Sequence, residues 1–354
     1  MAKERIHDLK QTSASFQIRG VVFGMKKNNA YQSGTSKNGG NWNSIEFGLN
    51  INDKKPVFIK LNGFPRDEVY YYKAAEKKGE KGTTKKVAWK DRKKSPGEGF
   101  RLIGVNISTD KDENGKNINE MFVEYDAVEY LHDNLKDGDS LFVKGNMVFS
   151  SYTDRNDQPQ RKVELVPTQI SYTQDAIDFS ADDFKEMAEF ENTLVFSDIE
   201  KETDENGKST GRFILTGYSI GYSTVEPVSF IIDQDHAKLA GNIKKKLKAS
   251  NSIKTYGRIE IVSNVSAVDD NDDDDGWGES SPMERQNAPV KREYIIYKAV
   301  PDSIDTETYS EDSIAKAIKA IKNAKNAEEK FADKSDDGNE DWGKDDDNHD
   351  EDPW

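Results

Sequence analysis

The segment from Gly63 to Gly99 holds the side chains best suited to binding chemistry in this sequence. It carries eleven Lys and Arg residues, six Asp and Glu residues and five aromatic residues. Ammonium and guanidinium groups can follow a chain of phosphates, and aromatic rings can stack on nucleobases. The segment therefore suits a single-stranded nucleic acid. The alternative is a solvated loop whose aromatic residues touch the core.

The residues that we expect to bind nucleic acid fall into two classes. The stacking rings are Tyr70, Tyr71, Tyr72 and Trp89 in the basic segment, with Tyr31 and Trp42 shortly before it. The phosphate contacts are Lys77, Lys78, Lys81, Lys85, Lys86, Lys90, Arg92, Lys93 and Lys94. The pattern gives no sign of base-specific reading, so we expect little sequence preference.

Catalysis finds little support in the sequence. The four histidines are scattered without the spacing of metal ligands, and there is no cysteine. The motifs GxxxxGKS/T, GxSxG and HExxH are missing. Acidic pairs are plentiful, but they lie in low-complexity runs, which lack the fixed geometry that acid–base catalysis requires. We therefore expect a protein that is not an enzyme and that uses no cofactor and no metal.

The net charge of −15 is unevenly distributed along the chain. Residues 266–288 carry eight acids and one Arg, and residues 333–354 carry eleven acids and two Lys, so the remainder is nearly neutral. The segment 333–354 cannot bury enough apolar surface to fold, and we expect a disordered acidic tail. No apolar run approaches the ~20 residues that span a bilayer, and the N-terminus lacks an apolar signal core. The sequence thus predicts a cytoplasmic protein without membrane contact.

Strand-like segments dominate the rest of the chain and predict a mainly β protein. The predicted order in the second half is three strands, a helix and two strands. This is the order of the OB-fold, a five-stranded Greek-key barrel. The strands are expected at 192–201, 212–219, 225–233, 252–262 and 291–300, and the helix at 235–247. The first half matches this order if residues 100–125 form an added or split hairpin that carries the basic arm, with its turn at the Asn-Gly pair within Asp112–Lys116.

A repeat relates the two halves. Leu135–Phe149 aligns without gaps on Leu247–Ile261 at a constant offset of 112 residues, and Gly145 meets Gly257. Such a repeat predicts two copies of one fold, although a chance similarity of two helix–strand units is the alternative. We therefore expect two OB-fold-like five-stranded barrels in tandem, followed by an amphipathic helix and the tail. The predicted units are an N-terminal arm 1–15, a first domain 16–175 with its basic arm 63–99, a second domain 189–304, a helix 310–332 and the tail 333–354.

Two further segments bear on how such barrels would work. The acidic insert 266–288 falls between the last two strands of the second half, at a loop that borders the ligand cleft of OB-folds. It would repel phosphate there, or cover a basic groove until nucleic acid displaces it. In the helix 310–332, Ile314, Ile318 and Ile321 form an apolar stripe that predicts docking on its barrel. A phosphate contact through the lysines that flank this stripe is the alternative.

The end of the chain resembles the tail tip of bacterial and phage single-stranded DNA-binding proteins, which combine OB-fold domains with a disordered acidic tail. The matching residues are Asp350, Glu351, Asp352, Pro353 and Trp354. In that family the tip recruits replication and repair proteins. The resemblance implies that Trp354 is the apolar anchor and that the three acids steer the encounter. The sequence departs from the family in its terminal Trp, where Phe is usual, and in its two barrels within one chain.

The basic segment and the tip together predict sequence-independent binding of single-stranded DNA in DNA replication, recombination and repair. The expected setting is the cytoplasm of a bacterium or of a phage-infected host cell. The expected partners are single-stranded DNA and replication or repair proteins, and the chain is compatible with homo-oligomers. Two alternatives stay open: a strand-annealing protein, and an acidic nucleic-acid mimic that occupies the basic surface of another protein.

Overall fold

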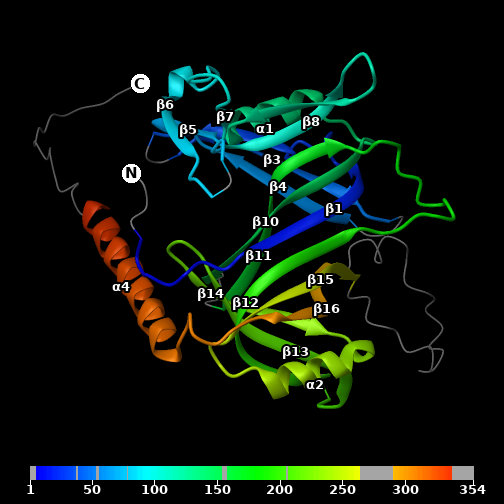
Figure 1. The fold of residues 1–354 in the computed structure, drawn as a ribbon, viewed down its shortest axis with the longest axis vertical. Coiled ribbons are helices and arrows are strands. Elements are labelled where there is room, and N and C mark those ends of the chain that lie inside the picture. The colour runs from blue at the N-terminus through cyan, green and yellow to red at the C-terminus, as the bar shows by residue number, and fades with distance from the viewer. Residues whose placement is uncertain are drawn as a thin grey trace, which may run out of the picture.

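A computed structural model describes residues 5–36, 39–52, 56–77, 79–153, 158–204, 206–263 and 290–336. Most of these residues lie in strands and few lie in helices, so the predicted mainly β class is confirmed (Figure 1). Within these ranges, none of the helices has the length and apolar character needed to cross a membrane. The acidic insert 266–288 and the part of the tail from 337 onward lie outside the described residues.

The first half contains β1 to β11 and α1. Its elements are β1 (Ala14–Phe23), β2 (Tyr31–Thr35), β3 (Asn41–Asn50), β4 (Pro56–Gly63), β5 (Glu68–Lys73), β6 (Thr83–Ala88), η1 (Trp89–Asp91), β7 (Arg101–Leu102), β8 (Val105–Lys111), β9 (Asn117–Phe122), α1 (Glu124–Asn134), β10 (Ser140–Thr153) and β11 (Pro159–Tyr172). The second half contains β12 (Ala188–Thr203), β13 (Ser209–Ile220), β14 (Val225–Ile232), η2 (Gln234–His236), α2 (Ala237–Lys246), β15 (Ser252–Ser263) and β16 (Val290–Asp305). The helix α4 (Glu311–Asp336) follows.

The five strands of the second half pair in a closed cycle. The strand β12 pairs with β13 and with β15, β13 pairs with β14, and β16 joins β14 to β15. Of the five pairings in this cycle, the β14–β16 pairing is parallel and the other four are antiparallel. The helix α2 lies between the third and fourth strands of this half, as the sequence predicts.

The first half repeats this order with one change. Here β4 pairs with β3, β3 with β1, β1 with β10 and β10 with β11, and all four pairings are antiparallel. The strand β11 lies beside β4, but its parallel hydrogen-bonded neighbour is β8 of the added β8–β9 hairpin. The predicted hairpin at 100–125 is therefore present, with its turn at Asp112–Lys116, and it pairs along β11.

The two halves are joined by a strand pairing. Ala14–Ile18 of β1 pairs antiparallel with Ala188–Asn192 of β12, so one thirteen-stranded sheet runs through both halves. One hydrophobic core cluster also contains residues of both halves. Figure 1 accordingly shows α1 and α2 at opposite ends of the molecule, with β1 and β12 between them. The tandem halves expected from the sequence therefore share one sheet and one core.

The structure confirms the repeat at offset 112. The helices α1 and α2 end at Asn134 and Lys246, and β10 and β15 begin at Ser140 and Ser252. The shared glycines sit at register shifts next to a partner strand. A Cβ on Gly145 would lie 2.0 Å from the Val166 carbonyl oxygen, and a Cβ on Gly257 would lie 2.4 Å from the Ile295 carbonyl oxygen. Both bulges therefore exclude a side chain, which explains why the repeat keeps a glycine there.

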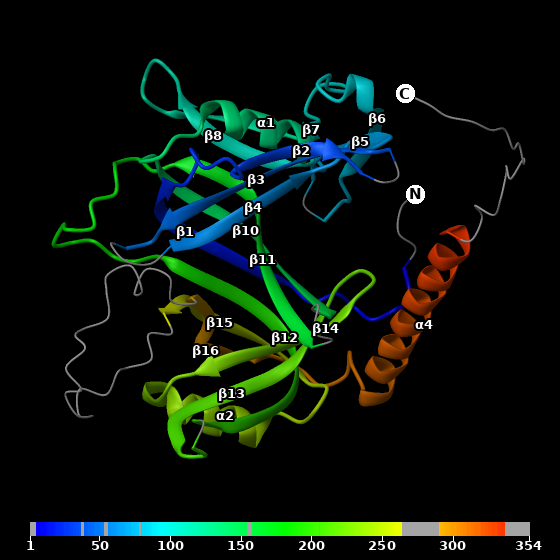
Figure 2. The ribbon, with the colours of Figure 1, turned by 180° about the vertical axis from the view of Figure 1, so that it is seen from behind.

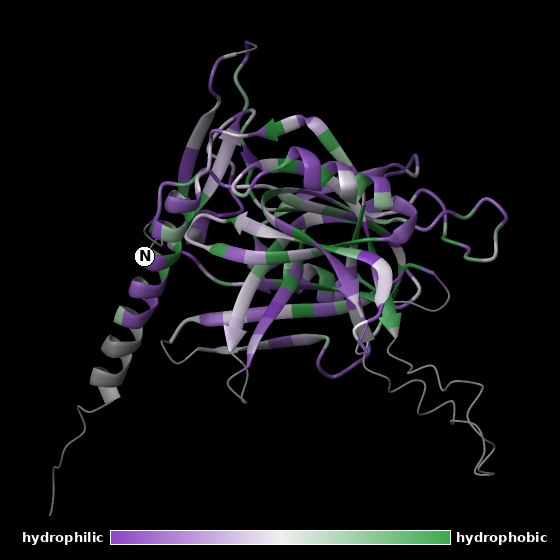
Figure 3. Ribbon diagram, turned by 90° about the horizontal axis from the view of Figure 1, so that it is seen from below, coloured by the Kyte–Doolittle hydropathy of each residue, from purple (hydrophilic) through white to green (hydrophobic). Residues whose placement is uncertain are grey.

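The helix α4 lies along one side of the molecule (Figure 2). It packs on the second half through Ile314 and Ala317, while Ile318 is 39% exposed. The prediction that Ile318 belongs to the buried apolar stripe is therefore wrong. Ala317 lies on the buried side of the helix in its place. The N-terminal arm runs between α4 and the second half, where Lys10 O accepts a hydrogen bond of 2.9 Å from the Tyr309 hydroxyl. Figure 3 shows the strands alternating between hydrophobic and hydrophilic residues, whereas α4 is largely hydrophilic.

Candidate nucleic-acid interface

The outward side of β4 carries rings and charge at alternate positions. Val57, Ile59 and Leu61 are fully buried in the core, because successive side chains of a strand point to opposite faces. Phe58, which is 41% exposed, and Lys60 share the other face. Phe64, directly after the strand, is 57% exposed.

The neighbouring strands widen this face. Gly48 of β3 pairs with Phe58, and it also pairs with Phe23 of β1. A Cβ on Gly48 would overlap the Phe23 ring, so the glycine leaves room for that ring on the surface. The rings of Phe23 and Phe58 meet edge to face at 5.9 Å. The two rings thus form an aromatic platform at one end of the face.

A depression of about 220 Å³ lies beside this platform, and Lys27, Gln32 and Lys60 help to line it. The Lys27 ammonium lies 5.7 Å from the centre of the Phe23 ring. The Lys60 ammonium lies 3.7 Å from the Glu46 carboxylate, and the two side chains are 38% and 47% exposed. An exposed ion pair of this kind contributes little to stability, so Lys60 stays available to a phosphate.

The two predicted rings that precede the basic segment lie on different sides. Trp42 follows the outward alternation of β3 with Ser44 and Glu46, and it is half-buried against its cross-strand partner Gly34. Tyr31 pairs with the buried Ile45 and stacks on His132 of α1, with ring centres 4.2 Å apart. Trp42 therefore lies on the outward face of β3 and β4, whereas Tyr31 lies on the opposite side.

The basic segment folds into a small sheet in the order β6, β5, β7. Tyr70 and Tyr72 lie on the outer side of β5 and are 40% and 44% exposed. Tyr71 is only 5% exposed and packs with Val69 and Val123. The prediction that Tyr71 stacks on a base is therefore wrong, because strand alternation turns its ring into the core.

Arg92 is the second correction. Its guanidinium donates two hydrogen bonds to the Asp126 carboxylate, at 2.9 and 2.8 Å, and these bonds raise the pKa of Arg92. It also lies 4.4 Å from the centre of the Trp89 ring, whose other neighbour is Tyr125 at 6.1 Å. Both side chains are occupied within the protein. Arg92 and the half-buried Trp89 therefore hold the basic segment on α1, and Arg92 is not a phosphate contact.

The predicted lysines differ in their surroundings. Lys86 pairs with Glu68 at 2.9 Å, which raises the Lys86 pKa, and its ammonium lies 5.6 Å from the centre of the Tyr70 ring. Lys94 pairs with Asp91, and Lys85 lies over Phe100. The exposed remainder is Lys77, Lys81, Lys90 and Lys93. Lys78 and the tip residues Asp350, Glu351, Asp352, Pro353 and Trp354 lie outside the described residues.

The structure thus brings together a face that the sequence interpretation missed: Phe23, Lys27, Phe58 and Lys60. One signal was present, since PVFIKL (Pro56–Leu61) alternates and puts Phe58 and Lys60 at the positions opposite to its aliphatic residues. Within the described ranges, no group of three or more His, Asp or Glu side chains could hold a metal ion.

Comparison with known proteins gives distant similarities and a family. No curated protein matches the chain. Two crystal structures of the single-stranded DNA-binding protein from Thermus aquaticus are similar to it. A deletion mutant has a TM-score of 0.38, 9% identity and coverage of 82% of this chain and 94% of that chain. The wild type has a TM-score of 0.37, 8% identity and coverage of 82% and 93%.

These two similarities are too distant to assign a function or a site to the chain. The family comparison reaches further, because the family model described as YorF matches residues 74–334, well over half of the sequence. The chain belongs to the YorF family.

Proposed function

We propose that this protein binds single-stranded DNA without sequence preference on the outward face of β3 and β4. The observation that carries the proposal is the outward pair Phe58 and Lys60 on β4, flanked by Phe23 of β1 and Trp42 of β3. Rings and cations at short intervals suit a ligand that repeats a phosphate and a base. We include the exposed Tyr70 and Tyr72 of β5 in the proposed binding surface, with Lys86 beside Tyr70.

The proposed fold agrees with this placement. We take each half as a barrel of the OB-fold type, on the strength of the closed strand cycle of the second half and the matching order of the first. OB-folds bind oligonucleotides on the face of their second and third strands. We take β3 and β4 as those strands in the first half, and Phe58 of β4 forms the aromatic platform together with Phe23 of the adjoining β1.

The proposed role is non-catalytic and belongs to DNA replication, recombination and repair. The resemblance of the tip supports recruitment of replication and repair proteins, with Trp354 as the anchor. Each stacked base would add roughly 1–3 kcal/mol to binding. If Z phosphates are neutralised, log K falls with log salt at a slope of about −0.7Z.

A titration of labelled oligo-dT at two salt concentrations tests the proposal. Phe58→Ala is expected to weaken binding about tenfold through the loss of one stacked base. Lys60→Ala is expected to reduce the salt slope by about 0.7. Tyr222→Ala and Lys116→Ala are the matched controls, since Tyr222 and Lys116 are exposed and lie away from this face.

Failure of the wild-type protein to bind in dilute buffer would exclude the proposed function. Equal losses in the controls would show that the face of β3 and β4 is not the site. If the protein binds and also accelerates pairing of complementary strands, strand annealing replaces passive binding as its activity.

A further inference from the structure

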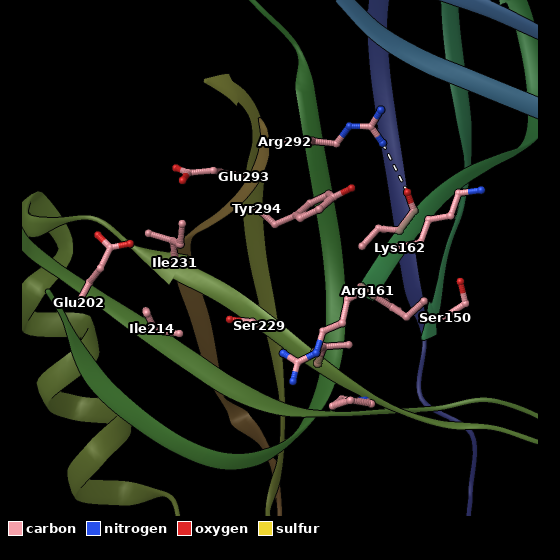
Figure 4. A pocket seen from close by; sticks show the side chains of 14 residues that line it. Ser150, Arg161, Lys162, Glu202, Ile214, Ser229, Ile231, Arg292, Glu293 and Tyr294 are labelled. Atoms are coloured by element: carbon pink, nitrogen blue, oxygen red, sulfur yellow. Dashed lines mark hydrogen bonds between the residues drawn. The ribbon is translucent and has the colours of Figure 1, made fainter. Parts of the chain in front are cut away.

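A second cavity, of about 310 Å³, lies where the two halves meet (Figure 4). We refer to it as the junction pocket. Both halves line it: Phe149, Ser150 and Arg161 come from β10 and β11, and Ile214, Ser229 and Tyr294 come from β13, β14 and β16. Ile214 and Ser229 belong to the second and third strands of the second half, the counterparts of β3 and β4. The pocket is therefore on the equivalent face, partly covered by the β10–β11 hairpin.

The floor of the junction pocket is formed by packed apolar side chains. Tyr294 is 8% exposed and packs against Phe230 of the core, and the Phe149 ring meets Phe230 edge to face at 6.2 Å. The half-buried Ile214 and Ile231 complete the floor. Flat apolar walls with a few hydroxyl groups, here Ser150 and Ser229, suit one nucleobase better than a charged group.

Two arginines from different halves stand at this pocket. Arg161 of β11 is exposed, and Arg292 of β16 donates a hydrogen bond of 3.5 Å to the Val163 carbonyl oxygen across the junction. Within the described ranges, neither forms an ion pair. The acids of the opposite wall, Glu202 and Glu293, both meet Arg212, at 3.5 and 2.5 Å. The positive charge at the mouth is therefore not cancelled by the acids that line the pocket.

The junction pocket is connected to the candidate interface. A neighbouring depression of about 350 Å³ shares Arg161, Arg292 and Tyr294 with it and extends to Pro56 and Phe58 of β4. Phe58 in turn lines the depression beside the aromatic platform. A single extended chain can therefore follow the surface from Lys60 past Phe58 to Arg161.

We propose that the junction pocket seats one nucleotide of the strand that is bound on β3 and β4. Its base lies on the apolar floor, and the phosphates on either side contact Arg161 and Arg292. One strand is thereby held by both halves at once. This inference rests on the proposed function, because it assigns a further contact to the same ligand.

The test compares two labelled oligo-dT lengths by fluorescence anisotropy. About 8 nucleotides fall within the range that one OB-fold covers, and about 30 exceed it. The double variant Arg161→Ala, Arg292→Ala is expected to bind the long strand at least tenfold more weakly and the short strand within twofold of wild type. For the long strand, the slope of log K against log salt should decrease in magnitude by about 1.4, because this variant neutralises two fewer phosphates. Thermal unfolding of each variant checks that it is folded.

Two further variants sharpen the result. Ser229→Trp fills the cavity and keeps both arginines, so it should reproduce the selective loss with the long strand. Lys111→Ala, Lys116→Ala removes the same charge from the exposed β8–β9 hairpin and should change neither length. An unchanged affinity of the arginine variant for the long strand, or equal losses for both lengths, would overturn the inference while the proposed function stands. Wild-type protein that binds neither oligonucleotide would instead remove the proposed function itself.

Discussion

Phe16 of β1 and Phe190 of β12 lie directly opposite each other where the two halves meet. In the other direction, Phe16 pairs with Gly145 and Phe190 pairs with Gly257, the two glycines of the repeat. Phe16 and Phe190 thus occupy equivalent positions in two halves that are related by an approximate two-fold symmetry. Both rings are almost fully buried, at 1% and 2% exposure. The joint is therefore a part of the common core.

The first prediction concerns this joint. Phe16→Ala and Phe190→Ala are each expected to lower the free energy of unfolding by about 3–5 kcal/mol, the usual cost of removing a buried Phe ring. Because β1 is hydrogen-bonded to both halves, the wild-type protein should unfold in one transition. Calorimetry together with urea unfolding measures both quantities. Two separate transitions in the wild type would show that the halves are independent.

The second prediction concerns Ser250, a non-glycine residue with a left-handed backbone, at φ 72°. Its counterpart in the repeat is Gly138, at φ 97°. A side chain with this backbone conformation destabilises the folded protein by roughly 1–2 kcal/mol. Replacement by glycine recovers only part of this free energy, because glycine gives the unfolded chain more conformational entropy. Ser250→Gly should therefore stabilise the protein by about 0.5–1 kcal/mol, and Gly138→Ser should destabilise it by about 1 kcal/mol. Urea unfolding decides, and a destabilising Ser250→Gly would contradict the argument.

The third prediction separates the three consecutive tyrosines. Tyr70→Ala and Tyr72→Ala should each weaken oligo-dT binding about tenfold, because each removes one stacking ring, and should leave the melting temperature nearly unchanged. Tyr71→Ala should instead lower stability, since it empties a core position and removes the hydrogen bond of 2.7 Å from its hydroxyl to Arg92 O. Anisotropy and thermal unfolding of the three variants measure the split. The reverse pattern would mean that β5 presents its other side to the ligand.

The fourth prediction concerns the attachment of the basic segment through Arg92 and Asp126. Removal of one partner leaves a mostly buried charge unpaired, at a cost of about 3 kcal/mol. Arg92→Ala should therefore loosen the segment, seen as faster trypsin cleavage within residues 74–99. Lys93→Ala, its exposed neighbour, is the control. If cleavage is equally slow in both variants, the ion pair does not hold the segment in place.

The fifth prediction concerns acid stability. Hydrogen bonds from the Thr308 hydroxyl and from two backbone N–H groups lower the pKa of Asp305 from 3.8 to about 2. A lowered pKa in the folded state stabilises the protein above the unfolded pKa, and this contribution is lost as the pH falls through the folded value. Asp305→Ala should therefore lower the melting temperature at pH 7, and the difference from wild type should shrink between pH 4 and pH 2. Asp302→Ala is the exposed control. A difference that is constant with pH would contradict the role of the carboxylate.

The order of elements in the second half follows from local pattern alone. Alternating and β-branched residues predict its strands, the repeat predicts equal positions for α1 and α2, and Asn-Gly turns predict hairpins. These features depend on backbone preferences and on side-chain periodicity, both of which are properties of short segments. The same reasoning failed at Tyr71, Arg92 and Ile318. Whether Tyr71 and Arg92 are free or occupied depends on partners far along the sequence, Val123 and Asp126.

The sequence by itself determined that this chain is mainly β, that one unit occurs twice and that its basic and acidic residues are segregated. Only the tertiary structure decided that β1 joins the halves into one sheet and that Phe23, Phe58 and Lys60 share a face. It also decided that Arg161 and Arg292 meet at a junction pocket. The reason is that strand pairing brings together residues that lie far apart in the sequence, and no local pattern records which edges will pair.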